Sequence, residues 1–270
     1  MIIDAHAHVA REYSTPESII EISKRFDIDK IVLCTSPKNN LDLNDPPNIP
    51  FIKSPMGIYL LNRLLRFAYN SFIKDNGDGN KHVLEISKSI PEIVVPFFWL
   101  NPLDTLQMSN LENNIRDYQI RGIKLHQAWN PFRIDGCEFN RLVEIARAKK
   151  LPIFIHLYSK RETRKLLQFI GNNQDVTFII AHMLGLEIFK EERHILSNVY
   201  FDTSGSERVR GKDILEAINL FGHEHVIFGS DTPYARIGDQ IIKVEQMNIN
   251  DSVKEHIFRL NIEHVLSAIS

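Results

Sequence analysis

The stretch from residue 139 to residue 171, FNRLVEIARAKKLPIFIHLYSKRETRKLLQFIG, contains the pattern that decides the fold. Both of its ends carry apolar residues at helical spacing with polar residues on the opposite face, as amphipathic helices do. Between them, LPIFIHL is a short continuous apolar run, which is typical of a strand buried on both faces of a parallel sheet. The stretch therefore predicts a helix, a buried strand and a second helix.

Seven further runs of β-branched or aromatic residues repeat this pattern along the chain. Eight buried strands that alternate with helices match a closed α/β barrel, the (β/α)8 TIM barrel, which commonly takes about 250 residues. An open doubly wound sheet is the alternative. We predict a single barrel domain over residues 1–270. The seven runs are MIIDAHAH (1–8), KIVLCTS (30–36), EIVVPFFWL (92–100), RGIKLHQ (121–127), VTFIIAHM (176–183), VYFDTSG (199–205) and VIFGSDTP (226–233).

One connection, roughly residues 37–89, is too long for a simple loop between a strand and a helix. Its first half, NNLDLNDPPNIP, is rich in residues that favour turns. Its second half, YLLNRLLRFAYNSFIKDNGDGN, carries a Leu, Phe and Tyr stripe at helical spacing. We expect a helical insertion after the second strand that covers one end of the barrel, either as a structural cap or as a substrate lid.

Composition excludes several classes of protein. The 34 acidic and 32 basic residues nearly balance, so neither a nucleic acid nor an anionic membrane surface is an expected partner. The longest apolar run, IVVPFFWL, is far shorter than the roughly 20 residues that span a bilayer. Two cysteines are too few for a disulfide framework. We expect a cytoplasmic protein with a small-molecule substrate, and homo-oligomerisation stays open.

Histidines gather at the carboxyl ends of the predicted strands, where barrel enzymes build their active sites. The eighth run adds a carboxylate, Asp231. Several imidazoles and one carboxylate suit zinc or another borderline divalent ion and leave room for a water. We predict a metal site at this end of the barrel, although each histidine alone could be a core residue and Asp231 a helix or turn cap. Five of the 11 histidines contribute: His6, His8, His126, His156 and His182.

The chain also contains a series of motifs that occurs in the same order in a known family. They are DAHAH (4–8), GIKLH (122–126), LPIFIH (151–156), IIAHMLG (179–185), VYFDTSG (199–205), VIFGSDTP (226–233) and RLNIEHVL (259–266). On these motifs the sequence resembles the amidohydrolase superfamily over essentially its whole length. It is most similar to the branch called amidohydrolase family 2, which includes the aminocarboxymuconate-semialdehyde decarboxylase-like enzymes.

The resemblance implies a metal site and a catalytic histidine. It implies one divalent ion, with zinc favoured, and His182 beside the bound water. Two ions are the alternative, bridged by a carboxylated Lys124 as in other branches of the superfamily. The implied metal ligands are His6, His8, His156 and Asp231.

Four residues near the middle of the chain are candidates for substrate binding. Lys124 is expected to bind a carboxylate or phosphate, or else to pair with a buried acid. His126 shares its strand face and would also contact substrate. Trp129 and Arg133 follow this strand and are candidates for apolar and anionic contacts, with core packing and surface exposure as the alternatives.

The expected reaction follows from the metal. A bound divalent ion lowers the pKa of its water toward about 7, which supplies hydroxide at neutral pH. We therefore predict a hydrolase that cleaves an amide, ester or lactone, with Asp231 also accepting a proton. The alternative is a non-oxidative decarboxylase of an unsaturated or aromatic carboxylic acid. A metal-binding barrel without catalytic activity is the second alternative.

Overall fold

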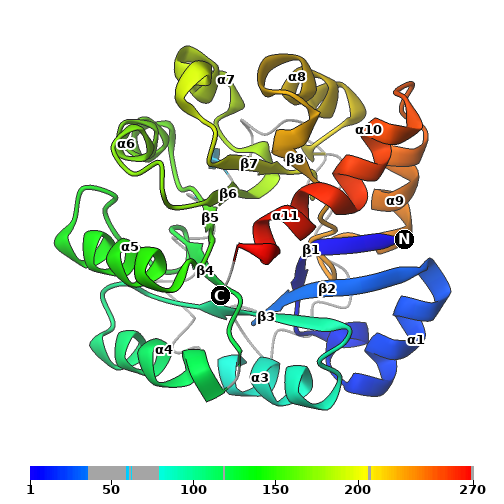
Figure 1. The fold of residues 1–270 in the computed structure, drawn as a ribbon, viewed down its shortest axis with the longest axis horizontal. Helices are drawn as coiled ribbons and strands as arrows, with labels where there is room; N and C mark the ends of the chain where they lie inside the picture. Colours follow the sequence, from blue (N-terminus) through cyan, green and yellow to red (C-terminus); the bar gives the residue numbers. More distant parts are fainter. Residues whose placement is uncertain (36–58, 61, 63–78, 118, 206–207, 269–270) are drawn as a thin grey trace.

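A computed structural model describes residues 1–35, 59–60, 62, 79–117, 119–205 and 208–268. Eight parallel strands pair in sequence order from β1 to β8 and form a ring enclosed by helices (Figure 1). The predicted (β/α)8 TIM barrel is therefore confirmed. The strands are β1 (Ile2–His8), β2 (Ile28–Cys34), β3 (Val94–Trp99), β4 (Gly122–His126), β5 (Ile153–His156), β6 (Phe178–Ile180), β7 (Val199–Asp202) and β8 (Val226–Ile227).

The helices lie outside the ring of strands, and the last ones also cover the end of the ring where the strands begin. Short 3-10 turns lie between strands and helices: η1 (Arg11–Tyr13), η2 (Ala181–Met183), η3 (Lys190–Ile195) and η5 (His223–His225). The α-helices are α1 (Pro16–Phe26), α3 (Gly79–Ser89), α4 (Thr105–Asp117), α5 (Cys137–Lys149), α6 (Lys160–Gly171), α7 (Leu186–Phe189), α8 (Gly211–Phe221), α9 (Ile237–Glu245), α10 (Asp251–Glu255) and α11 (Asn261–Ser267).

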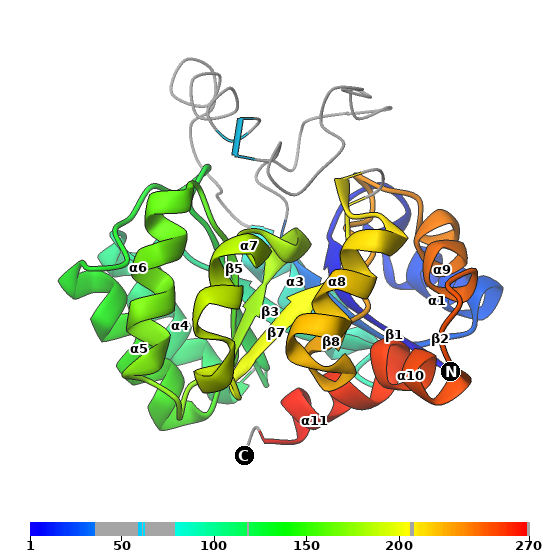
Figure 2. The ribbon, with the colours of Figure 1, turned by 90° about the horizontal axis from the view of Figure 1, so that it is seen from above.

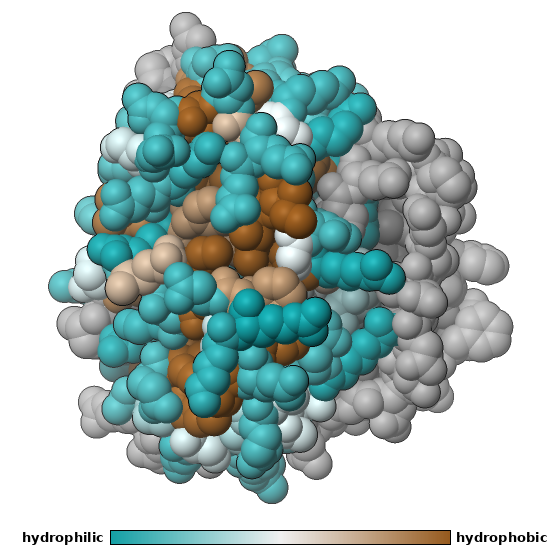
Figure 3. All heavy atoms as spheres, turned by 90° about the vertical axis from the view of Figure 1, so that its right-hand side faces the viewer, coloured by the Kyte–Doolittle hydropathy of each residue, from teal (hydrophilic) through white to brown (hydrophobic). Residues whose placement is uncertain are grey.

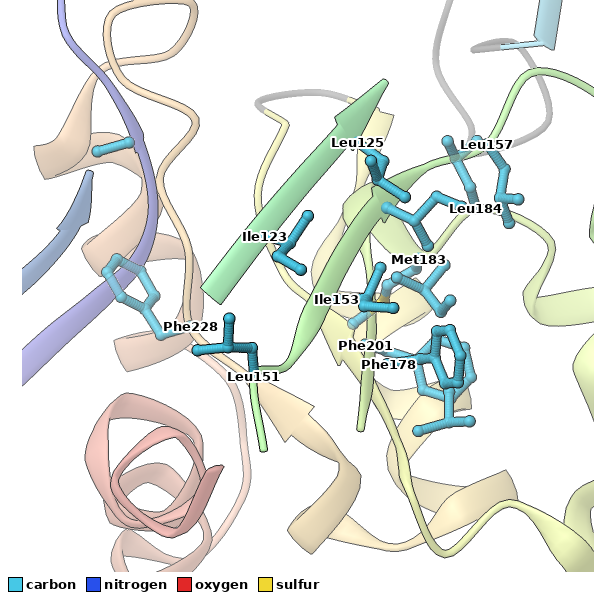
Figure 4. Packing of buried hydrophobic residues seen from close by; sticks show 14 of the residues in the cluster. Ile123, Leu125, Leu151, Ile153, Leu157, Phe178, Met183, Leu184, Phe201 and Phe228 are labelled. Carbon is cyan, nitrogen blue, oxygen red and sulfur yellow. The ribbon is translucent and has the colours of Figure 1, made fainter. Parts of the chain in front are cut away.

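Alternation along the strands separates a helix-facing core from the barrel interior. On β4 and β5, Ile123 and Ile153 join the large cluster packed between strands and helices (Figure 4). The next residue on each strand, Lys124 and Phe154, is paired across the sheet and points into the barrel. Since side chains alternate along a strand, a continuous apolar run can supply both layers.

The ring closes between β1 and β8. The amide of Ala5 donates to the carbonyl of Phe228 at 3.0 Å, and the amide of His8 donates to the carbonyl of Thr232 at 2.8 Å. Ala7 and Thr232 form a parallel bridge. The first strand and the segment after the last strand thus lie side by side, although they are more than 200 residues apart in the sequence.

The C-terminal helices cover the end of the barrel where the strands begin. Figure 2 shows α10 and α11 below the strands, and a π-helical turn, η6 (His256–Leu260), joins them. Ile262 and Val265 of α11 pack into the interior cluster. Nδ2 of Asn261 donates to the carbonyls of His223 at 2.7 Å and Val226 at 2.8 Å. With this end filled, a substrate site belongs at the opposite end, where the strands terminate.

The predicted insertion of residues 37–89 falls mostly outside the described residues. Its last part forms α3, a helix that precedes β3. Tyr59 and Asn62 are described, and they contact the barrel at α6 and at the end of β5: the Tyr59 hydroxyl lies 2.7 Å from Thr163 Oγ1, and Asn62 Nδ2 donates to the carbonyl of Leu157 at 2.8 Å. Whether the insertion is a cap or a lid stays a prediction, as does the single domain.

No helix in the described part of the chain is long and apolar enough to cross a membrane. Figure 3 shows the side of the molecule that carries α1 and α9, where apolar side chains gather between hydrophilic ones. The exposed large apolar residues include Ile242 on α9, Leu106 on α4 and Leu103 just before α4.

Replacing Asn261 with Ala should lower the free energy of unfolding by about 1–3 kcal/mol, because two carbonyls at the barrel floor lose their donor. Metal affinity should not change, since Asn261 lies at the end opposite to the histidines. Urea unfolding and metal titration of the same variant measure both effects. Ser267→Ala, an exposed position on α11, is the control. A wild-type unfolding midpoint in Asn261→Ala would contradict this role.

Candidate metal centre

Three donor groups meet where β1 and β8 end. His6 and His8 lie on β1, and Asp231 follows β8. Nε2 of His6 lies 3.6 Å from Oδ1 of Asp231, and Nε2 of His8 lies 3.4 Å from the same oxygen. All three side chains are buried, and their donor atoms lie within 4.8 Å of one another. Two imidazole nitrogens and one carboxylate oxygen at this spacing fit a borderline divalent ion.

The second ring nitrogen of each histidine is held by an acceptor. Nδ1 of His6 donates to Oδ2 of Asp202 at 2.8 Å, and Nδ1 of His8 donates to the carbonyl of Thr35 at 2.8 Å. Acceptors at Nδ1 orient the rings and direct Nε2 toward the site, as is common around metal-binding histidines. Burial, followed by the charge of Lys124, lowers the pKa of His6 to about 3, so this imidazole is neutral.

Asp231 is fixed through its backbone and its charge. Its φ of +62° lies in the left-handed region, and its amide donates to the carbonyl of His6 at 2.7 Å. Burial acts to raise the pKa of Asp231, but His182 and a hydrogen bond from His8 lower it below its ordinary value. The carboxylate is therefore ionised, which is the state that binds a metal.

Lys124 lies against the donor group from inside the barrel. Its Nζ is 2.6 Å from Nε2 of His6 and 3.9 Å from the centre of the Phe154 ring. The side chain is buried, and this burial lowers the pKa of Lys124. The electron pair on Nε2 of His6 thus faces the amino group of Lys124, which carries a positive charge when it is protonated. This contact is consistent with a cation site at these donors.

His126 and His156 form a second imidazole pair beside the donors. Their strands pair them directly, and their ring centres lie 3.8 Å apart. Nε2 of His156 lies 3.1 Å from Oδ1 of Asn62. The described residues contain a second three-donor group, His6, His182 and Asp202, and His156 belongs to neither group. His126 stacks on Trp99, with ring centres 5.6 Å apart. Burial lowers the pKa of both histidines well below the ordinary value, so both are neutral.

The two remaining substrate candidates have different surroundings. Trp129 lies beside the imidazole pair, with its ring centre 6.0 Å from that of His126. Arg133 does not join the site, because its guanidinium is 73% exposed and pairs with Asp135 through two hydrogen bonds of 2.9 Å. The structure therefore places Arg133, a candidate for an anionic contact, in a local surface ion pair.

His182 lies between the donor group and the imidazole pair. Its ring centre is 5.2 Å from that of His6 and 5.0 Å from that of His156. Its Nε2 is 4.0 Å from Oδ2 of Asp231, and its Nδ1 is 2.8 Å from Oγ of Ser204. Burial lowers the pKa of His182. The ring is therefore neutral and faces the same space as the donors.

Sequence reasoning missed the residues that hold these side chains. Asp202 is fully buried, and interaction with His6 lowers its pKa to about 2 although burial acts to raise it. Asp4 accepts hydrogen bonds from the amide of Ser230 at 2.8 Å and from its hydroxyl at 2.6 Å. The signal in the sequence was a carboxylate inside an otherwise apolar run: Asp4 lies in MIIDAHAH and Asp202 lies in VYFDTSG.

A family model described as amidohydrolase matches residues 3–267. No curated protein matches the sequence significantly. Solved structures share the fold at low sequence identity, and three of them are described below. A likeness this remote shows the fold alone.

The first is a 2,6-dihydroxybenzoate decarboxylase from Rhizobium, with a TM-score of 0.69, 12% identity and coverage of 98% of each chain. The second is a dihydroxybenzoic acid decarboxylase from Polaromonas with bound manganese and the inhibitor 2-nitroresorcinol, with a TM-score of 0.67, 15% identity and coverage of 98% of this chain and 96% of that one. The third is a putative amidohydrolase from Staphylococcus aureus, with a TM-score of 0.70, 15% identity and coverage of 98% of this chain and 99% of that one.

These comparisons correct the predicted reaction. The prediction of a hydrolase is contradicted, because the structural neighbours with a named reaction are decarboxylases, and the decarboxylase alternative is favoured. The family match supports an enzyme. The donor group and the manganese in the Polaromonas structure support a divalent metal, but they do not support zinc in particular.

Replacing His6 and His8 together with Ala should abolish tight metal binding and leave a folded barrel. The two imidazoles supply two of the three donors, whereas the helix-facing core contains neither residue. Elemental analysis and circular dichroism of the purified variant measure the two outcomes. His264→Ala, an exposed histidine on α11, is the control. Stoichiometric metal in the double variant would refute the donor assignment.

Replacing Asp202 with Asn should weaken metal affinity by about 10- to 100-fold, the usual cost of changing the acceptor behind a ligand histidine. The amide still fills the space but no longer supplies the negative charge to His6. Competition with a fluorescent chelator measures the affinity. Asp135→Asn removes a surface carboxylate and should leave affinity unchanged. Equal affinities for all three proteins would show that Asp202 does not support His6.

Proposed function

The chain belongs to the amidohydrolase family, in the branch called family 2, and we propose that it removes carbon dioxide from a small aromatic or unsaturated carboxylic acid in a metal-dependent, non-oxidative reaction. One observation carries the proposal. Buried metal donors share the end of the barrel with two neutral imidazoles and two indole rings. The fold neighbours named as decarboxylases add support.

We assign His6, His8 and Asp231 to the metal. The bound ion would supply positive charge that neutralises the oxygens of an anionic substrate. Manganese is the first metal to test because the Polaromonas neighbour holds it, and zinc is the second. We favour one ion. His156 becomes a fourth ligand only when its Nε2 leaves Oδ1 of Asn62.

Flat rings beside the donors suit a planar substrate. The rings of Trp99 and His126 are inclined by only 13°, and Trp129 adds a third ring next to His126. Planar groups stack favourably at this kind of surface. Because His126 is neutral, it can exchange a hydrogen bond with a substrate hydroxyl without the cost of a buried charge.

Decarboxylation needs a proton at the carbon that loses the carboxylate. When the carbon–carbon bond breaks, carbon dioxide leaves, the electron pair stays on the substrate carbon, and a proton from solution replaces the lost group. We assign His182 to carry this proton at Nε2, since that atom faces the donor group. The nearby carboxylate of Asp231 favours the protonated ring at the moment of transfer. Lys124 lies against the donor group, where its amino group in the protonated form would attract the substrate carboxylate.

Manganese-loaded protein should convert at least one member of a panel of hydroxybenzoates and unsaturated carboxylic acids into the product that lacks carbon dioxide. Mass spectrometry of the products and metal-free protein as the control test this. A product that has gained water would contradict the proposal, as would full metal loading with no turnover of any member of the panel. The latter result would favour a metal-binding barrel without catalytic activity.

Replacing His182 with Asn should lower kcat by roughly 100-fold or more, the usual range for loss of a positioned acid or base. Metal affinity should stay near that of the wild type, because His6, His8 and Asp231 remain. Steady-state kinetics and metal titration on one preparation separate the two effects. If affinity falls together with activity, His182 is a ligand and the assignment is wrong.

A further inference from the structure

We propose that Ser204, held by Asp202, is a positioning residue that fixes the hydrogen of His182 at Nδ1 and leaves the electron pair of Nε2 directed into the site. The importance of this arrangement for turnover rests on the proposed function. The position of the hydrogen follows from the contacts alone. Ser204 and Asp202 lie at the end of β7, next to His182 after β6, and all three side chains are buried.

The hydrogen-bonding capacity of Asp202 determines the direction of the network. Both carboxylate oxygens of Asp202 face N–H or O–H groups, so the carboxylate acts only as an acceptor. Oδ1 accepts from the amide of Ser204 at 2.8 Å, and Oδ2 accepts from the Ser204 hydroxyl and from Nδ1 of His6. Because a serine hydroxyl has a single hydrogen, Ser204 donates it to Asp202 and has only electron pairs left for other partners.

His182 must therefore be the donor in its contact with Ser204. Its Nδ1 lies 2.8 Å from Oγ of Ser204 and 3.3 Å from the carbonyl of the same residue. Both atoms accept, so the two contacts are satisfied only when Nδ1 carries the hydrogen. In the neutral ring, Nε2 then has a free electron pair, and this atom is the one nearest to Asp231.

The backbone supports the same orientation. His182 has φ of 54° and ψ of 29°, a left-handed conformation that is rare for a residue with a Cβ. Its amide donates to Oδ2 of Asp202 at 3.3 Å, so this carboxylate holds both the backbone of His182 and the hydroxyl that contacts its ring. Such strained conformations persist where surrounding contacts determine them.

Two glycines make the close approach of these groups feasible. A Cβ at Gly205, which has φ of +107°, would lie 3.1 Å from Nδ1 of His182. A Cβ at Gly229 would lie 2.2 Å from Oδ1 of Asp202, far inside the normal contact distance. Side chains at these positions would displace the ring or the carboxylate, so the network depends on both glycines.

For the proposed reaction, the fixed hydrogen gives Nε2 a single function. Nε2 takes up a proton before transfer and releases it to the substrate carbon, while Nδ1 keeps its hydrogen and its bond to Ser204 throughout. A ring with the opposite tautomer would present an N–H to the site and could not take up another proton there. Fixing the tautomer therefore raises the fraction of protein that is ready to react.

Nitrogen NMR of the metal-free wild-type protein tests the position of the hydrogen directly. At about pH 8, where imidazoles are ordinarily neutral, His182 should show a protonated Nδ1 and an unprotonated Nε2. The His182→Asn variant identifies the signals by their loss. A hydrogen at Nε2 in the wild-type protein overturns the proposal, and this measurement depends on no variant of Ser204 being able to fold.

Ser204→Ala tests the role of the hydroxyl. Loss of the acceptor at 2.8 Å should populate the Nε2–H form and lower kcat by about 10- to 100-fold, as other residues that orient an active-site group do. KM should change little because Ser204 is fully buried and its hydroxyl contacts Asp202 and His182. Ser204→Thr retains the hydroxyl and should retain the wild-type tautomer. An unchanged tautomer in Ser204→Ala overturns the proposal.

Thr203→Val is the matched control for loss of a buried hydroxyl. Oγ1 of Thr203 accepts a hydrogen bond from the amide of Gly229 at 3.3 Å, so its loss perturbs the same segment through a different bond. The His182 tautomer should keep its wild-type form in this variant, and a shift equal to that of Ser204→Ala would overturn the proposal. If the tautomer shifts only in Ser204→Ala but no carboxylic acid is turned over, the proposed function fails and this inference stands.

Discussion

The hydrogen bond from Nδ1 of His6 to the buried carboxylate of Asp202 is the interaction on which the rest of the site depends. It connects a histidine on β1 with an acid on β7, and so crosses the space between strands that are not neighbours in the sheet. A buried carboxylate without partners would be costly. Here several N–H and O–H groups satisfy Asp202, and the same bonds orient the ring of His6 and the segment around His182.

Closure of the barrel is a second condition for the donor group. His6 and Asp231 come from opposite ends of the chain, and they meet because the amide of Asp231 bonds to the carbonyl of His6. Asp4 strengthens this junction by accepting both the amide and the hydroxyl of Ser230. Asp4 is fully buried, and this burial raises its pKa to about 7. The fold thus assembles the candidate metal site only when its first and last strands pair.

The sequence was sufficient for the barrel because short apolar runs such as LPIFIHL alternate with segments that carry an apolar stripe at helical spacing. It also indicated which strand ends carry imidazoles. It could not indicate which side chains face one another across the barrel, because such contacts depend on register and on residues far apart in sequence. Asp202 reads as one acid in an apolar run, and only the structure shows that it meets His6. For the same reason, the contact of His156 with Asn62 was not foreseen. The pair of Arg133 with Asp135 is local and agrees with the surface exposure that the sequence left open for Arg133.

The metal donors could not distinguish hydrolysis from decarboxylation, because the specificity for a reaction depends on the residues around the donors. Histidines and a carboxylate at the end of a barrel can bind a metal in either class of enzyme, so the donor set alone does not select the reaction. What differs is the surface that faces the metal, because it decides which substrate atom approaches and where a proton can be delivered. In this chain that surface consists of neutral imidazoles and stacked rings, with His182 directed toward the donors by groups on β7. Under the proposed function, a carboxylated planar molecule bound there would have its leaving group near the metal and its ring carbon near Nε2 of His182, which is the arrangement that decarboxylation requires.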